Sequence, residues 1–199
     1  MERPRPVARL AVDGPPPKAD NRPKSLFGMT VFLNTMTRSY YTDSTTLVFA
    51  AEIVAAETHD GRPAVLLDPG YFYPTSGGQP HDTGELRRGD ETARVIDVVE
   101  RESDGAVLHV LDRPLPPGPV AAIIDRDRRL DHMRHHTGQH ILSQAFIRVA
   151  AAETVGFHLS NQSVTIDLNR ADLGATEIDA AEALANEVIQ ADTPVSVRF

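Results

Sequence analysis

The sequence predicts an α+β fold, in which a small antiparallel β-barrel is followed by a mixed α+β domain. Between residues 39 and 127, short runs rich in Val, Ile and Ala alternate with Asp-Gly turns. After Asp131 the apolar residues recur at helical spacing instead. A change of composition near the N-terminus sets a further segment apart. We therefore divide the chain into an arm over residues 1–35, a barrel over 36–127 and the first part of a second domain over 128–199.

Residues 1–35 form a segment of unusual composition. They contain both lysines and six of the 15 prolines of the chain, and they carry six basic and three acidic side chains, a net +3 against −8 overall. A proline-rich and weakly apolar segment cannot bury enough surface to offset the entropy lost on ordering. We expect a disordered arm, unless Met29 or Met36 is the true start of the protein.

Five runs between the arm and residue 127 have the composition of β-strands. The turn pairs Asp60-Gly61 and Asp104-Gly105 lie between them, and a proline-rich stretch over 114–119 precedes the last run. Short strands at this spacing are typical of a small antiparallel barrel. His109 alternates with apolar neighbours, which predicts a strand residue that faces solvent. The runs are 46–56, 64–67, 93–99, 107–111 and 120–124.

A helix that begins near His132 is predicted next, and it carries two histidines four residues apart. On a helix, His136 and His140 leave the same face, with Cβ atoms about 5–6 Å apart. Two neutral imidazoles at that separation can share one zinc ion, although two structural histidines produce the same pattern. A zinc protease would need a Glu directly after the first histidine, where this sequence has Thr137.

Three further elements are predicted after this helix. They are a strand over 163–168, a helix over 176–190 and the beginning of another strand over 195–199. A domain that stops on its last strand lacks a closing element. We therefore expect the sequence to end inside its second domain.

Residues 72–84 form a glycine loop with polar side chains. The paired Gly77 and Gly78 accept positive φ and allow backbone N–H groups to approach a ligand closely. Thr75, Ser76 and Gln79 add hydrogen-bonding groups that could recognise a small polar group. An ordinary hairpin connection accounts for the same residues, so the loop alone does not decide between the two interpretations.

The glycine loop and the histidine helix together resemble a known family. The run Tyr-Pro-Thr-Ser-Gly-Gly-Gln-Pro-x-Asp-Thr-Gly over 73–84, followed by Asp-His-Met-x-x-His-Thr-Gly-Gln-His over 131–140, is similar to the alanyl-tRNA editing proteins of the AlaX group. These are stand-alone relatives of the editing domain of alanyl-tRNA synthetase. Residues 156–159 and 165–168 also match, so the resemblance covers residues 38–199. It implies a β-barrel followed by the α+β editing domain shared by threonyl- and alanyl-tRNA synthetases.

The resemblance implies a trans-editing hydrolase that removes serine or glycine from mischarged alanine tRNA. Such editing is needed because a pocket sized for alanine rejects neither amino acid strongly. The family's zinc ion is held by a pair matching His136 and His140, together with a later Cys-x-x-x-His. This sequence has no cysteine. We therefore expect the N-terminal part of an editing protein, inactive or weak by itself, with a non-catalytic tRNA-binding or regulatory barrel module as the alternative.

The remaining site residues are predicted from position and chemistry. We expect the substrate to contact the glycine loop, with His158 and Ser160 lining the same cleft; the loop residues are Thr75, Ser76, Gly77, Gly78 and Gln79. No catalytic residue is identified. Arg128, Arg129 and Arg134 are expected to contact tRNA phosphates, although the aspartates between them equally describe a solvated helix start.

Charge and hydropathy limit the partners of the chain. A net charge of −8 argues against a basic surface all over the molecule, but it leaves room for a local basic patch. No apolar run approaches the roughly 18–20 residues needed to cross a membrane, and no secretory signal follows the N-terminus. These observations predict a cytoplasmic protein that does not enter a membrane, and the resemblance implies mischarged alanine tRNA as its partner.

Overall fold

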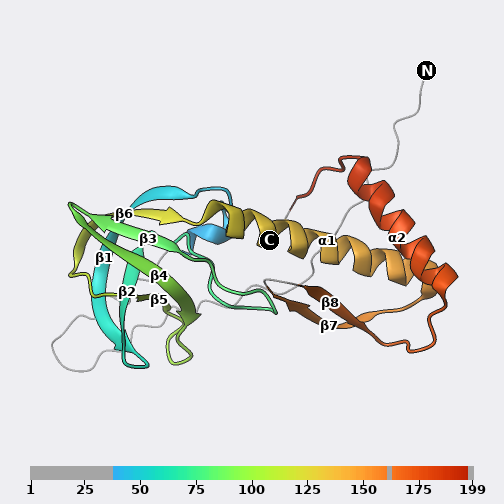
Figure 1. The fold of residues 1–199 in the computed structure, drawn as a ribbon, viewed down its shortest axis with the longest axis horizontal. Helices are drawn as coiled ribbons and strands as arrows, with labels where there is room; N and C mark the ends of the chain where they lie inside the picture. The colour runs from blue at the N-terminus through green and yellow to red at the C-terminus, as the bar shows by residue number, and fades with distance from the viewer. Residues whose placement is uncertain (1–37, 161–162, 197–199) are drawn as a thin grey trace, which may run out of the picture.

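The computed structural model describes residues 38–160 and 163–196, so the predicted arm over 1–35 and residues 197–199 of the last predicted strand lie outside the described residues. A barrel occupies one end of the molecule, and two helices with a two-stranded sheet occupy the other (Figure 1). The predicted α+β class, with the barrel first, is confirmed. Residues 195 and 196 form no strand.

Six antiparallel strands close the barrel in the order β1-β2-β5-β4-β3-β6. They are β1 (Val48–His59), β2 (Arg62–Asp68), β3 (Gly84–Arg88), β4 (Glu91–Glu100), β5 (Val107–Leu111) and β6 (Gly118–Ile124), after a short 3-10 helix, η1 (Ser39–Tyr41). Five of these strands correspond to the predicted runs. The sequence analysis missed β3, because Gly-Glu-Leu-Arg-Arg contains no β-branched or aromatic residue.

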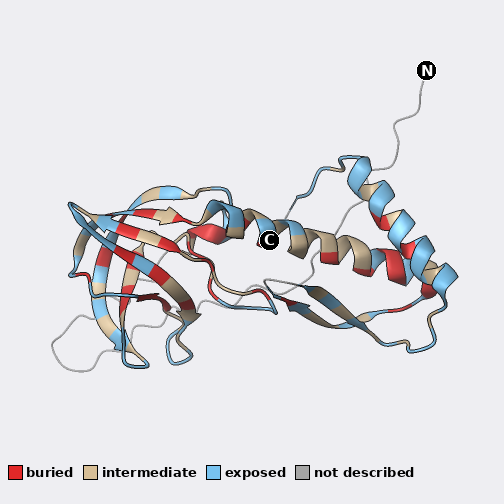
Figure 2. Cartoon of the chain, in the orientation of Figure 1, coloured by how far each residue is buried: buried red, intermediate tan, exposed pale blue. Residues whose placement is uncertain are grey.

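Inward-facing aliphatic side chains fill the barrel. In Figure 2, stretches of buried residues run along the barrel strands. Ile53, Leu67, Leu86 and Val95 are all 1% exposed or less. This core fixes the position of every loop that leaves the barrel, including the glycine loop between β2 and β3.

His109 on β5 corrects one prediction, because it is completely buried and does not face solvent. Its Nδ1 atom lies 3.3 Å from the carbonyl oxygen of Val65, and its ring meets that of Phe72 edge-on, with centroids 5.3 Å apart. Alternation misled the prediction because β5 is buried along its whole length. Burial lowers the pKa of His109 to about 4.

Helix α1 (Arg126–Ala150) follows β6 almost directly and runs from the barrel to the far end of the molecule (Figure 1). It begins about two turns before the predicted start near His132, because Asp125 already takes an extended N-cap conformation. It ends where Ala151 turns into the left-handed region, with φ of 49°. The histidine pair therefore lies in the middle of a long helix.

A hairpin of β7 (Thr154–Leu159) and β8 (Val164–Leu168) follows α1, and helix α2 (Ala175–Gln190) packs against α1. Small side chains allow the two helices to approach closely; Ala145 and Ala150 meet Ala181 and Ala185 in one apolar cluster. None of the helices in the described part of the chain combines the length and the apolar character needed to cross a membrane.

Candidate functional site

The glycine loop ends in a tight hairpin. Ser76 and Gln79 exchange backbone hydrogen bonds of 3.1 and 3.0 Å, so that Gly77 and Gly78 are the two central residues of the turn. Their φ angles of 57° and 79° lie in the left-handed region that a type I′ turn requires. The interpretation of this loop as a hairpin is therefore correct for the backbone. The hairpin also makes contacts with β7 and α1.

The hairpin packs directly on β7. The N–H of Leu159 donates to the carbonyl oxygen of Gly78 over 3.1 Å. A Cβ atom on Gly78 would lie 2.5 Å from the carbonyl oxygen of Phe157, whereas one on Gly77 would meet nothing within 4 Å. Gly78 is therefore required both by its backbone angle and by the closeness of β7.

Gln79 connects the hairpin to helix α1. Its side chain is buried, and its Oε1 atom lies 2.7 Å from Nδ1 of His136. An amide oxygen can only accept, so His136 carries its proton on Nδ1 and keeps a free lone pair on Nε2. The ring of His140 stacks beside that of His136 with centroids 5.0 Å apart, and the ring centroid of Phe157 lies 5.9 Å from that of His136. Three segments distant in sequence thus meet at one place.

Both histidines of this pair are held in their neutral form. Burial lowers the pKa of His136 and of His140, and the neighbouring His140 lowers that of His136 further. Neutral imidazoles are the form that binds metals and accepts protons. Within residues 38–160 and 163–196, no set of three or more His, Asp or Glu side chains could hold a metal ion. The pair would supply two of the three or four ligands of a zinc site.

The contacts of Thr75, His158 and Ser160 are with residues other than His136 and His140. The Oγ1 atom of Thr75 lies 3.1 Å from a ring nitrogen of His81. His158 projects from the opposite face of β7 to Phe157, where it is 74% exposed and lies 3.5 Å from Asp167. The hydroxyl of Ser160 donates to the carbonyl oxygen of Ser163 in the turn after β7. Gly78 and Gln79 are the loop residues that reach the histidine side of the site.

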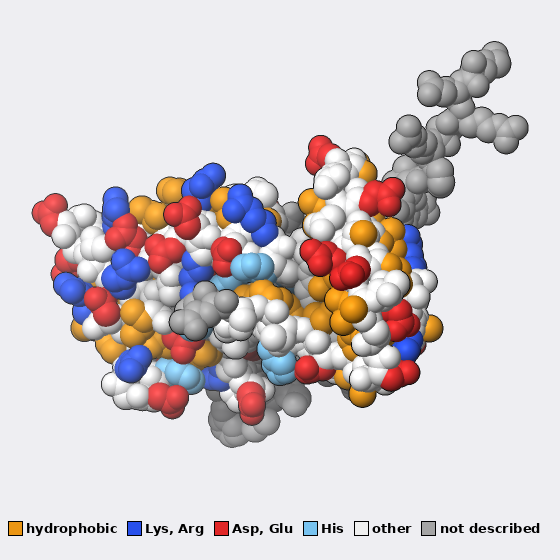
Figure 3. Space-filling model, turned by 45° about the vertical axis from the view of Figure 1, so that its right-hand side comes forward, with side chains coloured by type: hydrophobic (Ala, Val, Ile, Leu, Met, Phe, Trp, Pro, Cys, Tyr) orange, Lys and Arg blue, Asp and Glu red, His pale blue; other side chains and the backbone are white. Residues whose placement is uncertain are grey.

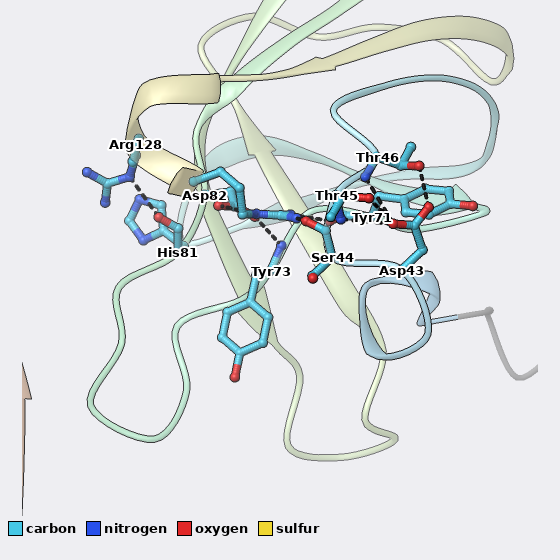
Figure 4. Close-up of polar contacts among 10 residues, drawn as sticks. Asp43, Ser44, Thr45, Thr46, Tyr71, Tyr73, His81, Asp82 and Arg128 are labelled. Atoms are coloured by element: carbon cyan, nitrogen blue, oxygen red, sulfur yellow. Dashed lines mark hydrogen bonds and ion pairs between the residues drawn. The ribbon is translucent and has the colours of Figure 1, made fainter. Parts of the chain in front are cut away.

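Arg129 requires a correction, because it cannot contact tRNA phosphates from its buried position. Its guanidinium donates to Asp82 over 2.6 Å, to the carbonyl oxygen of Ser44 over 2.6 Å and to that of Tyr71 over 2.6 Å. Asp82 also accepts the N–H of Tyr73 (Figure 4). The contacts of Arg129 and Asp82 tie both ends of the glycine loop to the first turn of α1, and so they hold Gln79 against His136.

Arg128 and Arg134 remain at the surface of α1. Together with Arg126 they line a hollow of about 450 Å³, in which Asp127 and Asp131 partly offset their charge. Arg128 also donates from Nε to the carbonyl oxygen of His81 over 2.9 Å, at the end of the glycine loop (Figure 4). Figure 3 shows basic and acidic side chains interspersed over the barrel and the start of α1, and acidic ones over α2.

The sequence analysis also missed a largely buried polar network that joins α1 to β7. Gln139 donates to the hydroxyl of Ser143 over 2.9 Å, and Thr154 of β7 donates to the same oxygen over 2.7 Å. Gln139 and Ser143 are four residues apart within an apolar stripe, and this spacing was visible in the sequence. Its partner Thr154 was not, because the contact depends on how β7 returns along α1.

Comparison with known proteins shows which family the chain belongs to. Residues 22–125, which include the whole barrel, match the family described as tRNA synthetases class II (A). The alanine–tRNA ligase of Methanopyrus kandleri is 34% identical over 166 residues, which are 81% of this chain and 18% of the ligase. The ligase of Halobacterium salinarum is 37% identical over 174 residues, which are 80% of this chain and 18% of that ligase.

A shorter relative carries an editing name. The alanyl-tRNA editing protein AlaX-L of Pyrococcus horikoshii is 32% identical over 164 residues, which are 80% of this chain and 40% of that protein. The chain thus spans less than half the length of each of these relatives. The matches to the ligases and to the editing protein extend well beyond the barrel, since each covers about four fifths of the chain. The chain belongs to the tRNA synthetases class II (A), with alanine–tRNA ligases and an alanyl-tRNA editing protein among its relatives.

Proposed function

We propose that this chain takes part in hydrolytic editing of alanine tRNA, in which serine or glycine is removed from the 3′ end of a mischarged molecule. The contact between Gln79 and His136 carries the proposal, because it joins a polar backbone loop to two neutral imidazoles. A loop with open N–H groups can hold an aminoacyl end, and adjacent imidazoles can serve a metal or a proton transfer. The relatives support tRNA as the partner.

Each part of the site has a distinct role in this proposal. The hydroxyls of Thr75 and Ser76 and the backbone of Gly77 and Gly78 hold the aminoacyl group. Gln79 holds the ring of His136. Arg128 and Arg134 contact tRNA phosphates, which fix the position of the acceptor end without reading its sequence.

Zinc is the proposed cofactor, held by His136 and His140. The Nε2 lone pair of His136 is available because Nδ1 donates to Gln79. A bound zinc ion would orient the substrate or lower the pKa of a bound water. Two ligands fall short of a complete set, so we expect weak zinc binding by this chain alone.

Zinc titration of the ¹⁵N-histidine-labelled chain tests the metal proposal. We expect the signals of His136 and His140 to respond first, and the response to be lost in His136→Ala and in His140→Ala. His135→Ala is the matched control, since His135 lies on the same helix but pairs with Asp131. A response spread equally over all histidines, or one unaffected by either substitution, would contradict a zinc role for the pair.

Hydrolysis of seryl-tRNA(Ala) tests the activity itself. An editing enzyme should release serine faster than buffer does, and Gln79→Leu should slow that release because His136 loses its hydrogen-bond partner. Release at the buffer rate, with or without zinc, would exclude a catalytic role for this chain by itself.

A non-catalytic tRNA-binding module is the second candidate, and the two-ligand histidine pair favours it. It predicts tRNA binding without hydrolysis. Arg134→Ala should then weaken binding and lower the salt dependence by about one counterion. Arg148→Ala on the last turn of the same helix is the control and should leave binding unchanged.

Localisation in the cytoplasm stays a prediction from the sequence.

A further inference from the structure

His81 and Asp97 form a polar pair that has no role in the function proposed above. His81 lies at the C-terminal end of the glycine loop, and Asp97 lies on β4 just after a bulge that shifts the register between Val95 and Asp97. Bulges re-aim side chains. Here the carboxylate of Asp97 comes within 3.0 Å of Nδ1 of His81, with both side chains partly exposed.

Thr75 completes the cluster from the other end of the loop. The backbone N–H of His81 donates to Oγ1 of Thr75 over 3.2 Å, and Nδ1 of His81 lies 3.1 Å from the same oxygen. The backbone N–H of Thr75 donates to the carbonyl oxygen of Val98 over 3.0 Å, next to Asp97 on β4. Both the hydroxyl and the backbone of Thr75 are therefore fixed.

The proton positions follow from these contacts. A carboxylate can only accept, so the Nδ1 atom beside Asp97 carries the proton of the ring. A protonated Nδ1 cannot accept from the hydroxyl of Thr75. Two donors of His81, its Nδ1–H and its backbone N–H, therefore point at Oγ1 of Thr75. The hydroxyl hydrogen of Thr75 can then be donated to a group other than His81. Thr75 is exposed, so a ligand can reach this hydroxyl group.

The same contacts exclude a nucleophilic role for Thr75. In a catalytic triad the base uses one ring nitrogen for the nucleophile and the other for the carboxylate. Here Thr75 and Asp97 both approach Nδ1 of His81, so the ring cannot remove the proton of the hydroxyl. The cluster orients a hydrogen bond and does not activate an attacking oxygen.

We infer that His81 and Asp97 hold Thr75 as a hydrogen-bond donor for the side-chain oxygen of a seryl group, so that the site prefers serine to glycine. The inference rests on the proposed function, since Thr75 is placed there in the aminoacyl pocket. Glycine offers no side-chain oxygen, and an ammonium group cannot accept from a donor. Thr75 acts on the ligand, whereas His81 and Asp97 are positioning residues.

Stable amide analogues test this inference on the full chain. The probes are 3′-amino-3′-deoxyadenosine acylated with serine or with glycine, and their affinities are measured by titration calorimetry. We expect tighter binding of the seryl probe. Thr75→Val and Asp97→Asn should each reduce the ratio of seryl to glycyl affinity about fivefold, the contribution of one neutral hydrogen bond. Glu100→Gln is the control on β4, because Glu100 pairs with Arg38 instead.

Histidine ¹⁵N spectra give a second measurement that a merely structural role would not change. Nδ1 of His81 should carry the proton in the wild type and in Glu100→Gln. In Asp97→Asn the amide can donate to Nδ1, so the proton should move to Nε2. An unprotonated Nδ1 in the wild type, or a seryl preference that survives this reversal, would overturn the inference.

The outcomes separate this inference from the proposed function. Binding of both probes with equal affinity overturns the inference and leaves an aminoacyl-adenosine pocket in place. Failure of the wild-type chain to bind either probe overturns the aminoacyl pocket, and the inference falls with it. Backbone amide spectra of each variant show whether the fold is retained, and Asp97→Asn tests the inference if Thr75→Val does not fold.

Discussion

Replacing Asp82 by Asn tests the buried ion pair that fixes the glycine loop to helix α1. Asp82 is 0% exposed and Arg129 is 3% exposed, so water reaches neither charge. Asn keeps the size of the side chain and removes its charge, which leaves the guanidinium buried without a counter-charge. Breaking such a pair costs about 3–5 kcal/mol. We therefore expect Asp82→Asn to lower the free energy of unfolding by about that amount.

The substitution should also disturb the histidine site from a distance. Arg129 binds the carbonyl oxygen of Tyr71, and Asp82 binds the N–H of Tyr73, so the pair holds the chain on both sides of Gln79. His136 lies seven residues along α1 from Arg129, about 10 Å at the rise of an α-helix. We expect the ¹⁵N signals of His136 to shift because Gln79 loses its fixed position.

Urea unfolding followed by far-UV circular dichroism measures the first effect, since the chain has no tryptophan. Asp104→Asn is the matched control: its carboxylate pairs with Arg101 at the surface, where such pairs contribute about 1 kcal/mol or less. Combining Asp82→Asn with Arg129→Met should recover part of the loss, because no unpaired charge remains. An effect of Asp82→Asn no larger than that of Asp104→Asn would refute the reasoning.

Two further predictions concern the barrel and the turn. Burial lowers the pKa of His109 to about 4 from a usual value of 6.5, so the unfolded chain takes up this proton first. The stabilisation is complete above pH 6.5 and is lost as the pH falls from 6.5 to about 4, by about 3 kcal/mol. His109→Gln should flatten this pH dependence in urea unfolding, and an unchanged dependence would contradict the assignment. Gly78→Ala should destabilise the chain more than Gly77→Ala, because only the former places Cβ 2.5 Å from a carbonyl oxygen. Hydrogen exchange at Leu159 should accelerate in Gly78→Ala alone; equal effects of the two substitutions would show that β7 does not constrain the turn.

The histidine helix illustrates what the sequence could predict about the site. Apolar spacing indicated a helix, and the four-residue interval placed His136 and His140 on one face. The predicted start of the helix was wrong. Its first turn is rich in arginine and has no apolar stripe, so the periodicity of apolar residues does not indicate a helix there. The partners of the pair could not be predicted, since Gln79 and Phe157 reach it from other elements.

The errors at His109 and Arg129 share one physical cause. Polar residues were assigned to the surface, which is correct unless a buried partner satisfies them. His109 is buried because β5 has no solvent-facing side, and Arg129 is buried because Asp82 and two carbonyl oxygens surround its guanidinium. The partners of these residues, Val65 for His109 and Asp82 for Arg129, are distant in sequence, so the burial of neither residue could be predicted.

By itself the sequence predicted the barrel strands before the first long helix and the shared face of His136 and His140, and it offered a hairpin turn at Gly77 and Gly78 as one of two interpretations. Each depends on residues that are close along the chain. Only the tertiary structure decided the three contacts that define the site, Gln79 with His136, Asp82 with Arg129 and His81 with Asp97. These contacts join residues that closure of the barrel and the docking of α1 bring together, and local periodicity contains no information about such pairs.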